Sequence, residues 1–518
     1  MTEAVAAPRA GRKEWIGLAV IALPCMLYSM DLTVLNLAVP ALSQDLEPSS
    51  TQLLWILDIY GFLVAGSLIT MGTLGDRIGR RRLLLIGAAA FGIASVVAAF
   101  STSAEMLIIS RALLGLAGAT LAPSTLSLIR NMFLDPAQRT FAIGVWVTSF
   151  SVGGAIGPLL GGIMLQYFHW GSVFLIGVPV MLLLLAVGPV FLPEFRDPNA
   201  GRLDLVSAAM SLAAVLLVIY GLKRIAEHGM GWVPVAATLA GIGIGAVFVR
   251  RQRRLADPFI DVRLFQSPAF STALAAYTLG TFVAFGMYIY IAQYLQLVLE
   301  LPPLQAGLWM LPYMLAFVVG SLVVPAISQR IRPAYFMSAG LVLAAVGFAI
   351  YTQIDRGPAL SLLVIGSVIY SLGISPVVIL ATDLIVGSAP VERAGAASAI
   401  SETSSELGGA LGIAVLGSIG AAVYRGVMAG AVPPGVPTVA AEAARSTLGG
   451  AMAEAGKLPG GAGAQLVGTA RDAFMQSLEL SAAICALIAV GTAILVAVLL
   501  RGVRAGAPAM EPEPVLSP

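Results

Sequence analysis

Charged residues, histidines and cysteines are scarce in this sequence of 518 residues. Only 11% of the residues are Asp, Glu, Lys or Arg, whereas a soluble domain carries about 25%, so an ordinary soluble protein is excluded. Cys25 and Cys485 both lie inside apolar runs, which argues against a disulfide-bonded scaffold and leaves no metal-ligand spacing. With His169 and His228 as the two histidines, a histidine-ligated metal enzyme is not expected either.

Hydrophobic residues, by contrast, make up 58% of the chain and gather in long runs. A helix needs ~20 apolar residues to cross the hydrocarbon core of a bilayer, and fourteen segments meet this requirement. The first run is too long for the apolar region of a signal peptide, so we expect it to be retained and the protein to be an all-α integral membrane protein. The predicted spans are 15–39, 52–74, 83–101, 105–129, 140–165, 172–192, 205–222, 233–249, 271–297, 306–327, 334–353, 359–387, 394–423 and 476–500.

The basic residues indicate how these spans are oriented. With the N-terminus inside, most Lys and Arg residues of the connections fall on the cytoplasmic side, as the positive-inside rule requires. Because the number of predicted spans is even, both termini are then cytoplasmic. The Gly-, Pro- and Ala-rich segment 424–475 falls outside the cell, where 438–456 and 464–475 are expected to form short amphipathic helices.

A weak internal repeat points to two similar halves. The segment GDRIGRRRLLLIG (75–87) aligns with SQRIRPAYFMSAG (328–340), with matching Arg, Ile and Gly residues at a constant offset. Six helices in each half, with two helices between them, account for this repeat. The predicted organisation is a cytoplasmic tail at 1–14, a six-helix half at 15–192, two linker helices at 193–270, a second six-helix half at 271–500 and a cytoplasmic tail at 501–518.

The connection after the second span carries a recognisable pattern, GTLGDRIGRRRL. It resembles the loop between helices 2 and 3 of the major facilitator superfamily, whose acid acts in the family as a latch that holds one of two alternating states. The resemblance implies that Asp76 pairs with a nearby Arg and with the N-terminus of the thirteenth span, near Arg393. The alternative is a basic cytoplasmic loop with an incidental acid. The matching positions are Gly72, Leu74, Asp76, Arg77, Gly79, Arg80 and Arg81.

The fifth span carries a glycine pattern with one proline. It resembles the antiporter motif of the exporting branches of the same superfamily, in which proline kinks the helix and glycines offer a smooth packing face. The alternative is a generic glycine-rich packing face. The matching positions are Gly144, Gly153, Gly157, Pro158, Gly161 and Gly162.

The first span contains MDLTVLNLAVP, which resembles the helix 1 signature of the fourteen-helix drug:proton antiporters. The segments PFIDVRLF (258–265) and GAASAISETSSELGGALG (395–412) are similar to that family too. The resemblance, strongest to exporters of the QacA/LfrA type, implies a major facilitator fold with 6 + 2 + 6 helices. Two positions depart from the pattern: Leu114 stands where the family often has Gln, and Gln329 stands where the first half has Asp76.

Six charged side chains lie inside the predicted spans, where charges are costly unless they face a bundle interior or water. Burial favours the neutral form of an acid, so such an acid can carry a proton and later hold a cation. Glu402 and Glu406 are four residues apart and share one helix face. The six are Asp31, Asp58, Arg111, Asp383, Glu402 and Glu406.

We expect Asp31, Asp58, Glu402 and Glu406 to couple protons and bind cations, and the family resemblance places Arg111 in proton relay. Alternatives remain for three of these groups. Asp31 could form a structural hydrogen bond, Arg111 could form a plain salt bridge to Asp31 or Glu105, and Asp383 could be a solvated or capping acid near a helix end.

Aromatic side chains are expected to supply the apolar part of a cation pocket, since a ring face attracts a cation. Each of them could equally face lipid. The candidates are Trp55, Tyr60, Trp146, Phe150, Phe285, Tyr288, Trp309, Tyr313 and Phe317.

The sequence thus predicts a transporter rather than an enzyme: a proton-coupled antiporter, monomeric, without cofactor, metal or nucleic-acid partner. It is expected to export lipophilic cations such as quaternary ammonium compounds, dyes and antibiotics across the bacterial cytoplasmic membrane. The alternative within transport is a dedicated exporter of one endogenous metabolite, antibiotic or lipid. Uptake is disfavoured by the antiporter motif, and a membrane enzyme or a non-transporting sensor is disfavoured by the scattered acids and the doubled architecture.

Overall fold

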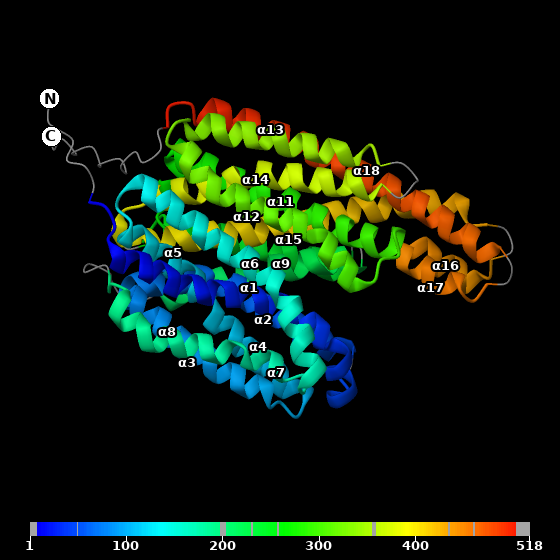
Figure 1. The fold of residues 1–518 in the computed structure, drawn as a ribbon, viewed down its shortest axis with the longest axis horizontal. Helices are drawn as coiled ribbons and strands as arrows, with labels where there is room; N and C mark the ends of the chain where they lie inside the picture. Colours follow the sequence, from blue (N-terminus) through cyan, green and yellow to red (C-terminus); the bar gives the residue numbers. More distant parts are fainter. Residues whose placement is uncertain are drawn as a thin grey trace.

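The computed structural model describes residues 8–48, 50–196, 204–228, 231–255, 258, 260–354, 359–433, 436–458 and 461–503. Within these ranges the regular structure is helical, and fourteen helical segments are long and apolar enough to cross a membrane. They run roughly side by side in an elongated bundle (Figure 1). The all-α membrane architecture and the number of spans predicted from the apolar runs are confirmed.

The first six spans form the N-terminal half. The fourth span is divided into α4 and α5, and the sixth into α7 and α8. Local signals fix where helices start: Ser103 accepts a hydrogen bond from the Met106 amide ahead of α4, and Asp135 accepts one from the Gln138 amide ahead of α6. The helices are α1 (Arg12–Leu46), α2 (Ser50–Ile78), α3 (Arg80–Ala99), α4 (Ala104–Gly118), α5 (Leu121–Met132), α6 (Pro136–Tyr167), α7 (Ser172–Leu175) and α8 (Gly177–Phe191).

Two linker helices, α9 (Leu205–His228) and α10 (Trp232–Gln252), follow. The start of α9 is tied to the end of α10, because Arg251 Nη2 lies 2.7 Å from Asp204 Oδ2. Burial opposes ionisation of Asp204, but hydrogen bonds from Ser207 and Arg251 lower its pKa to about 2. The carboxylate therefore stays charged at physiological pH, and this anchor of α9 does not depend on proton binding.

The remaining helices form the C-terminal half and a short helical insertion. They are η1 (Val262–Gln266), α11 (Pro268–Gln293), η2 (Tyr294–Val298), α12 (Pro303–Ser328), α13 (Pro333–Tyr351), α14 (Leu360–Ser388), η3 (Val391–Arg393), α15 (Ala394–Ala431), α16 (Thr438–Ser446), α17 (Leu448–Ala455) and α18 (Ala462–Leu499).

The segment 424–475 is more regular than the sequence indicated. Helix α15 continues to Ala431, and residues 464–475 are the first turns of α18 rather than a separate amphipathic helix. Each of these helices has 38 residues, about 57 Å at 1.5 Å per residue, which exceeds the ~30 Å hydrocarbon core. Their protruding ends meet α16 and α17, which form a cap at one end of the molecule (Figure 1).

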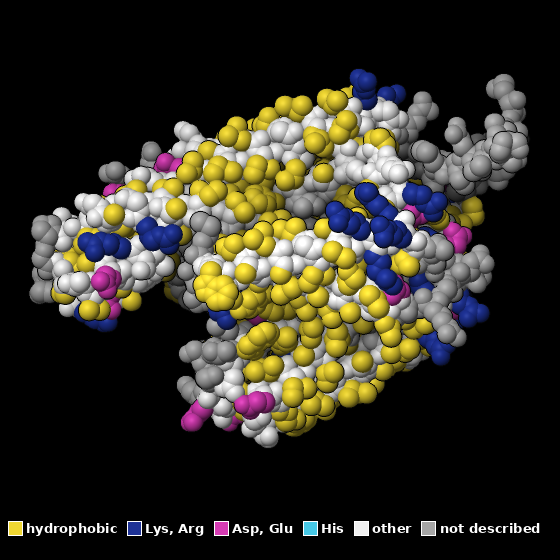
Figure 2. All heavy atoms as spheres, turned by 180° about the vertical axis from the view of Figure 1, so that it is seen from behind, with side chains coloured by type: hydrophobic (Ala, Val, Ile, Leu, Met, Phe, Trp, Pro, Cys, Tyr) yellow, Lys and Arg dark blue, Asp and Glu magenta, His cyan; other side chains and the backbone are white. Residues whose placement is uncertain are grey.

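The opposite end of the bundle holds the start of α1 and the finish of α18 (Figure 1). Lys and Arg side chains gather there, whereas hydrophobic side chains cover much of the flank (Figure 2). We call it the basic end. Its arginines include Arg80, Arg81, Arg82, Arg139 and Arg330.

Candidate functional site

An ion pair between α1 and α4 lies within the N-terminal half. Arg111 Nη1 lies 2.6 Å from Asp31 Oδ2, and the Arg111 side chain is 1% exposed. Its Nε donates to the Ile56 carbonyl (3.2 Å), and its guanidinium sits 4.7 Å from the centre of the Tyr60 ring. Of the alternatives for Arg111, the geometry therefore shows the pair with Asp31.

Two acids of α15 lie near this pair. The Tyr28 hydroxyl donates to Glu406 Oε1 at 3.4 Å, and the Glu406 residue is exposed. Glu402 Oε1, one turn nearer the basic end, is buried and has no hydrogen-bond partner among the described residues. An isolated buried carboxylate is costly, so Glu402 is suited to exist as the neutral acid.

An aromatic cluster of the N-terminal half lies beside Glu406 and contacts it through the Tyr28 hydroxyl. The Tyr28 ring lies 6.1 Å from Tyr60 and 5.6 Å from Phe150, and Phe150 lies 4.7 Å from Trp146. Trp146 is buried and donates from Nε1 to Thr125 (2.9 Å). The chain of contacts thus runs from Glu406 through Tyr28 and Tyr60 to the Arg111 guanidinium.

The fourth predicted acid, Asp58 on α2, is also paired. The Lys223 ammonium of α9 contacts the Asp58 carboxylate and lies 5.0 Å from the centre of the Phe62 ring. Trp55, one of the predicted pocket aromatics, packs edge-on against Phe62 at 6.4 Å. Asp58 and Trp55 therefore belong to a cluster centred on a lysine of the linker.

The other predicted aromatics belong to the C-terminal half, and three of them are exposed over more than a third of their surface. Tyr313 packs against Tyr370 with ring centres 5.4 Å apart. The exposed fractions are 51% for Phe285, 39% for Tyr288 and 45% for Trp309.

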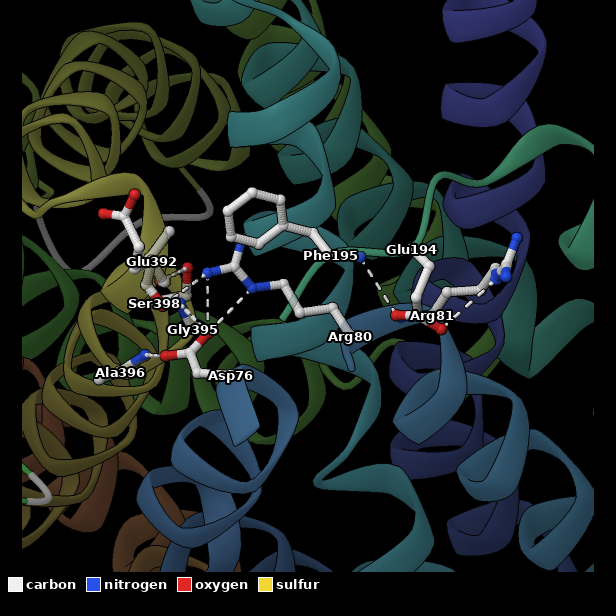
Figure 3. A network of polar contacts seen from close by, with 10 residues as sticks. Asp76, Arg80, Arg81, Glu194, Phe195, Glu392, Gly395, Ala396 and Ser398 are labelled. Atoms are coloured by element: carbon white, nitrogen blue, oxygen red, sulfur yellow. Dashed lines mark hydrogen bonds and ion pairs between the residues drawn. The ribbon is translucent and has the colours of Figure 1, made fainter. Parts of the chain in front are cut away.

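At the basic end, Asp76 joins α2 to the N-terminus of α15 (Figure 3). The backbone amides of Gly395 and Ala396 donate to its two carboxylate oxygens at 3.1 and 3.0 Å. Arg80 Nη2 lies 2.8 Å from the same carboxylate. A Cβ added at Gly72 would come within 2.5 Å of the Gly395 carbonyl, so the two helices approach each other closely here. A carboxylate at a helix N-terminus is stabilised by the free amides and the helix dipole.

The arginines around Asp76 tie the same loop to neighbouring segments. Arg80 also donates to the Glu392 carbonyl (3.2 Å), and Phe195 lies under its guanidinium at 4.9 Å. Arg81 contacts Glu194, which accepts from the Arg81 amide at 3.2 Å (Figure 3). Gly79 has a φ of 110°, a conformation that favours glycine. Arg77 is half-buried at the last turn of α2.

A second contact closes the basic end between α6 and α14. Arg139 Nε lies 2.6 Å from Asp383 Oδ1, and both side chains are 7% exposed. The Thr140 hydroxyl donates to the other Asp383 oxygen at 2.9 Å. Asp383 is therefore a buried, fully engaged acid that joins the two halves, and neither a solvated nor a capping group.

The glycines of α6 allow close packing against two different helices, α1 and α12. A Cβ at Gly153 would come within 2.0 Å of the Met26 carbonyl of α1, and one at Gly144 within 2.8 Å of the Ser321 carbonyl of α12. A Cβ at Gly162 would meet nothing within 4 Å. The remaining positions of the motif are Gly157 and Gly161, which are buried, and Pro158, whose side chain lies outside the described residues.

Three participants were missing from the sequence-based site: Lys223, Arg139 and Tyr28. Lys223 lies one residue beyond the predicted span 205–222, so it was not counted as a charge within the membrane. Its positive charge, close to a membrane span and opposite in sign to the acids of the predicted site, could have identified it as their partner. Arg139 was assigned to a basic connection, and Tyr28 precedes Asp31 by three residues, which places both on one helix face.

Comparison with known proteins agrees with this architecture. The family model described as Major Facilitator Superfamily matches residues 21–413. The chain is 43% identical over 493 residues to the multidrug efflux pump LfrA of Mycolicibacterium smegmatis, covering 95% of this chain and 97% of the relative. It is 35% identical over 490 residues to the methyl viologen resistance protein SmvA of Salmonella typhimurium, covering 92% and 97%.

The fold is also similar to a solved transporter. The crystal structure of the human organic anion transporter MFSD10 (TETRAN) aligns with a TM-score of 0.59 at 16% identity, covering 93% of this chain and 99% of that one.

Proposed function

Because the chain belongs to the Major Facilitator Superfamily and is a multi-pass membrane transporter, not an enzyme, we propose that it is a proton-coupled antiporter that exports lipophilic cationic drugs across the bacterial cytoplasmic membrane. The printed names of the relatives, a multidrug efflux pump and a methyl viologen resistance protein, support drug export. Proton coupling and the preference for cations are argued from the side chains.

The observation that carries the proposal is the placement of Glu406. Glu406 is an exposed residue of α15, and its carboxylate accepts a hydrogen bond from Tyr28 of the aromatic cluster. A carboxylate beside ring faces attracts an organic cation by charge and by cation–π contact, the latter contributing ~0.5–2 kcal/mol. Glu402 is half-buried, and its Oε1 is buried without a hydrogen-bond partner among the described residues, so this acid is suited to hold a proton on the same helix face.

The basic end indicates which side of the membrane is closed in this state. Under the positive-inside rule the basic end faces the cytoplasm, so both termini are cytoplasmic and the cap of α16 and α17 is outside. The Asp76 and Asp383 contacts then hold the cytoplasmic side closed. This state releases cargo outward and accepts protons from outside.

The proposed cycle uses these parts in turn. With the cytoplasmic side open, a lipophilic cation binds between Glu406 and the aromatic rings and displaces a proton from the acids of α15. The halves rock, α6 slides along α1 through Gly153, and the contacts at the basic end form. After the cation leaves, outside protons neutralise the acids and allow the return.

The test is transport by purified protein in liposomes whose lumen is more acidic than the bath, with the membrane potential clamped to zero. The wild-type protein is expected to accumulate ethidium in exchange for luminal protons. Glu406→Gln is expected to reduce this accumulation to background, because the amide neither releases a proton nor binds the cation by charge.

Glu454→Gln is the matched control. It removes a carboxylate of the cap, where Glu454 pairs with Lys457 at 2.7 Å, and ethidium accumulation should be unchanged. If Glu406→Gln still accumulates ethidium at the wild-type rate, the assigned role of the α15 acids is wrong.

A further inference from the structure

Linker helix α9 lies where the two halves meet. Its residues Val215 and Ile219 pack with Phe62 of α2, and Leu407 and Ala410 of α15 pack against the same apolar cluster. Helix α9 therefore touches both sides of an interface that has to rearrange whenever the halves rock.

Lys223 is the polar counterpart of this packing. It lies one turn beyond Ile219, and its ammonium contacts the Asp58 carboxylate of the N-terminal half and sits over the Phe62 ring at 5.0 Å. Glu406 of the C-terminal half is the chain neighbour of Leu407, which packs against the same apolar cluster as Ile219. A lysine within a membrane bundle is costly and marks a functional site by default.

These contacts are the ones that a cationic drug would make: a carboxylate, an aromatic face and a second acid nearby. We propose that Lys223 is a tethered counter-ion that occupies Asp58 in the state closed at the basic end and thereby competes with the transported cation. This inference rests on the proposed export of lipophilic cations and adds a residue from outside the two six-helix halves that sets the affinity for the cation.

The competition has a direction. In the state closed at the basic end, the Lys223 ammonium satisfies Asp58 and lowers the net negative charge that holds a cargo cation near Glu406. Cargo is then released toward the outside more readily than it would be from unpaired acids. A cargo cation can take Asp58 only if the ammonium moves away, so Lys223 weakens cation binding and speeds its release.

The test is binding of radiolabelled tetraphenylphosphonium to purified protein in nanodiscs, together with ΔpH-driven transport in liposomes. Lys223→Met keeps the length of the side chain and removes its charge. We expect the Kd to fall about tenfold and the maximal transport rate to fall as well, since release becomes slower. Lys223→Arg retains the charge and is expected to behave as the wild type.

Arg224→Met is the matched control, because Arg224 is the neighbouring cation on α9 and lies over the ring of Tyr220 at 5.7 Å. Its Kd should equal that of the wild type. In an Asp58→Asn background, adding Lys223→Met should lower the Kd for tetraphenylphosphonium very little. The carboxylate for which Lys223 and the cargo cation compete is then absent.

A purely structural role for Lys223 gives a different pattern. Lys223→Met would then lower the melting temperature without tightening binding, and Asp58→Asn/Lys223→Met, which removes both charges, would restore stability. Should Lys223→Met fail to fold, Lys223→Gln provides the same comparison. A Kd equal to or weaker than that of the wild type in a folded variant overturns the inference.

Failure of the underlying function is distinguishable from failure of the inference. If the wild-type protein binds no tetraphenylphosphonium and transports none, both are overturned. If the wild type binds and transports but Lys223→Met has the wild-type Kd, the inference alone is wrong.

Discussion

The two halves of the molecule hold the basic end closed by different chemistry. The first half presents Asp76 from the end of α2 to the backbone amides of Gly395 and Ala396. The corresponding loop of the second half has Gln329, whose amide donates to Pro325 of its own helix at 3.4 Å. There the acid comes instead from Asp383 on α14, which binds a side chain, Arg139.

The difference shows that a repeated fold does not require repeated contacts. A helix N-terminus accepts a carboxylate through its free amides whatever the local side chains are, so Asp76 is the one side chain that this contact with α15 requires. Asp76 also pairs with Arg80 of its own half, but Arg80 keeps the Glu392 carbonyl and the Phe195 ring as further partners. The second contact depends on two side chains of opposite charge, both buried. Removing one of them leaves the other as an unpaired charge, which makes the second contact the more vulnerable one.

Asp383→Asn is expected to have the largest effect. Among the described contacts Asp383 is the acceptor of the Arg139 guanidinium, and breaking one partner of a buried pair costs about 3–5 kcal/mol. The free energy that favours the state closed at the basic end over the open state should fall by this amount. Spin labels can be attached at Arg82→Cys and Arg330→Cys, both exposed positions. Double electron–electron resonance should then show a new population in which the two labels are farther apart.

The native cysteines do not interfere with this measurement, since Cys25 and Cys485 are buried. If Asp383→Asn leaves the distance distribution unchanged, the Arg139 contact does not hold the halves together.

Asp76→Asn is expected to have a smaller effect, about 1.5–3 kcal/mol, the range for hydrogen bonds to charged groups. Asparagine keeps one acceptor for the amides of α15, and Arg80 keeps the Glu392 carbonyl and the Phe195 ring. The same pair of spin labels should report a partial shift. A shift larger than that of Asp383→Asn would reverse the proposed order of the two contacts.

Gln329→Asp should have the smallest effect, within about 0.5 kcal/mol, as is usual for exposed positions. It gives the second half the acid that the first half has at Asp76. Because Gln329 is exposed and bonds within its own helix, we expect no latch to form. Added to Asp383→Asn, it should not restore the short distance, and a rescue would show that the two halves are chemically equivalent after all.

The apolar runs predicted the fourteen spans because burial in lipid requires length and hydrophobicity, both of which are visible in a sequence. Helix ends were less predictable. The apolar run ends near residue 222, but α9 continues to His228. The backbone hydrogen bonds of a helix do not require apolar side chains, so the helix extends beyond the run that predicted it. For this reason Lys223 was missed and Asp58 was left without its partner.

Pairs between distant segments were beyond the reach of the sequence. Arg139 and Asp383 are separated by 244 residues, and each alone reads as a polar residue near a helix end. Asp76 was different, because the motif around it predicted that it contacts the N-terminus of the thirteenth span. The amides that bind it, Gly395 and Ala396, lie at the start of that helix.

Helix α15 is unbroken from Ala394 to Ala431, and three of the features described above lie along it. The Asp76 contact lies at its first turn, Glu402 and Glu406 lie in its first half, and the cap of α16 and α17 packs at its far end (Figure 1). A rigid rod works as a lever, so any tilt that frees the first turn must swing the cap through an arc on the other side of the membrane. In the proposed orientation, a fluorophore on the cap would therefore signal, from outside the cell, the opening of a gate that faces the cytoplasm.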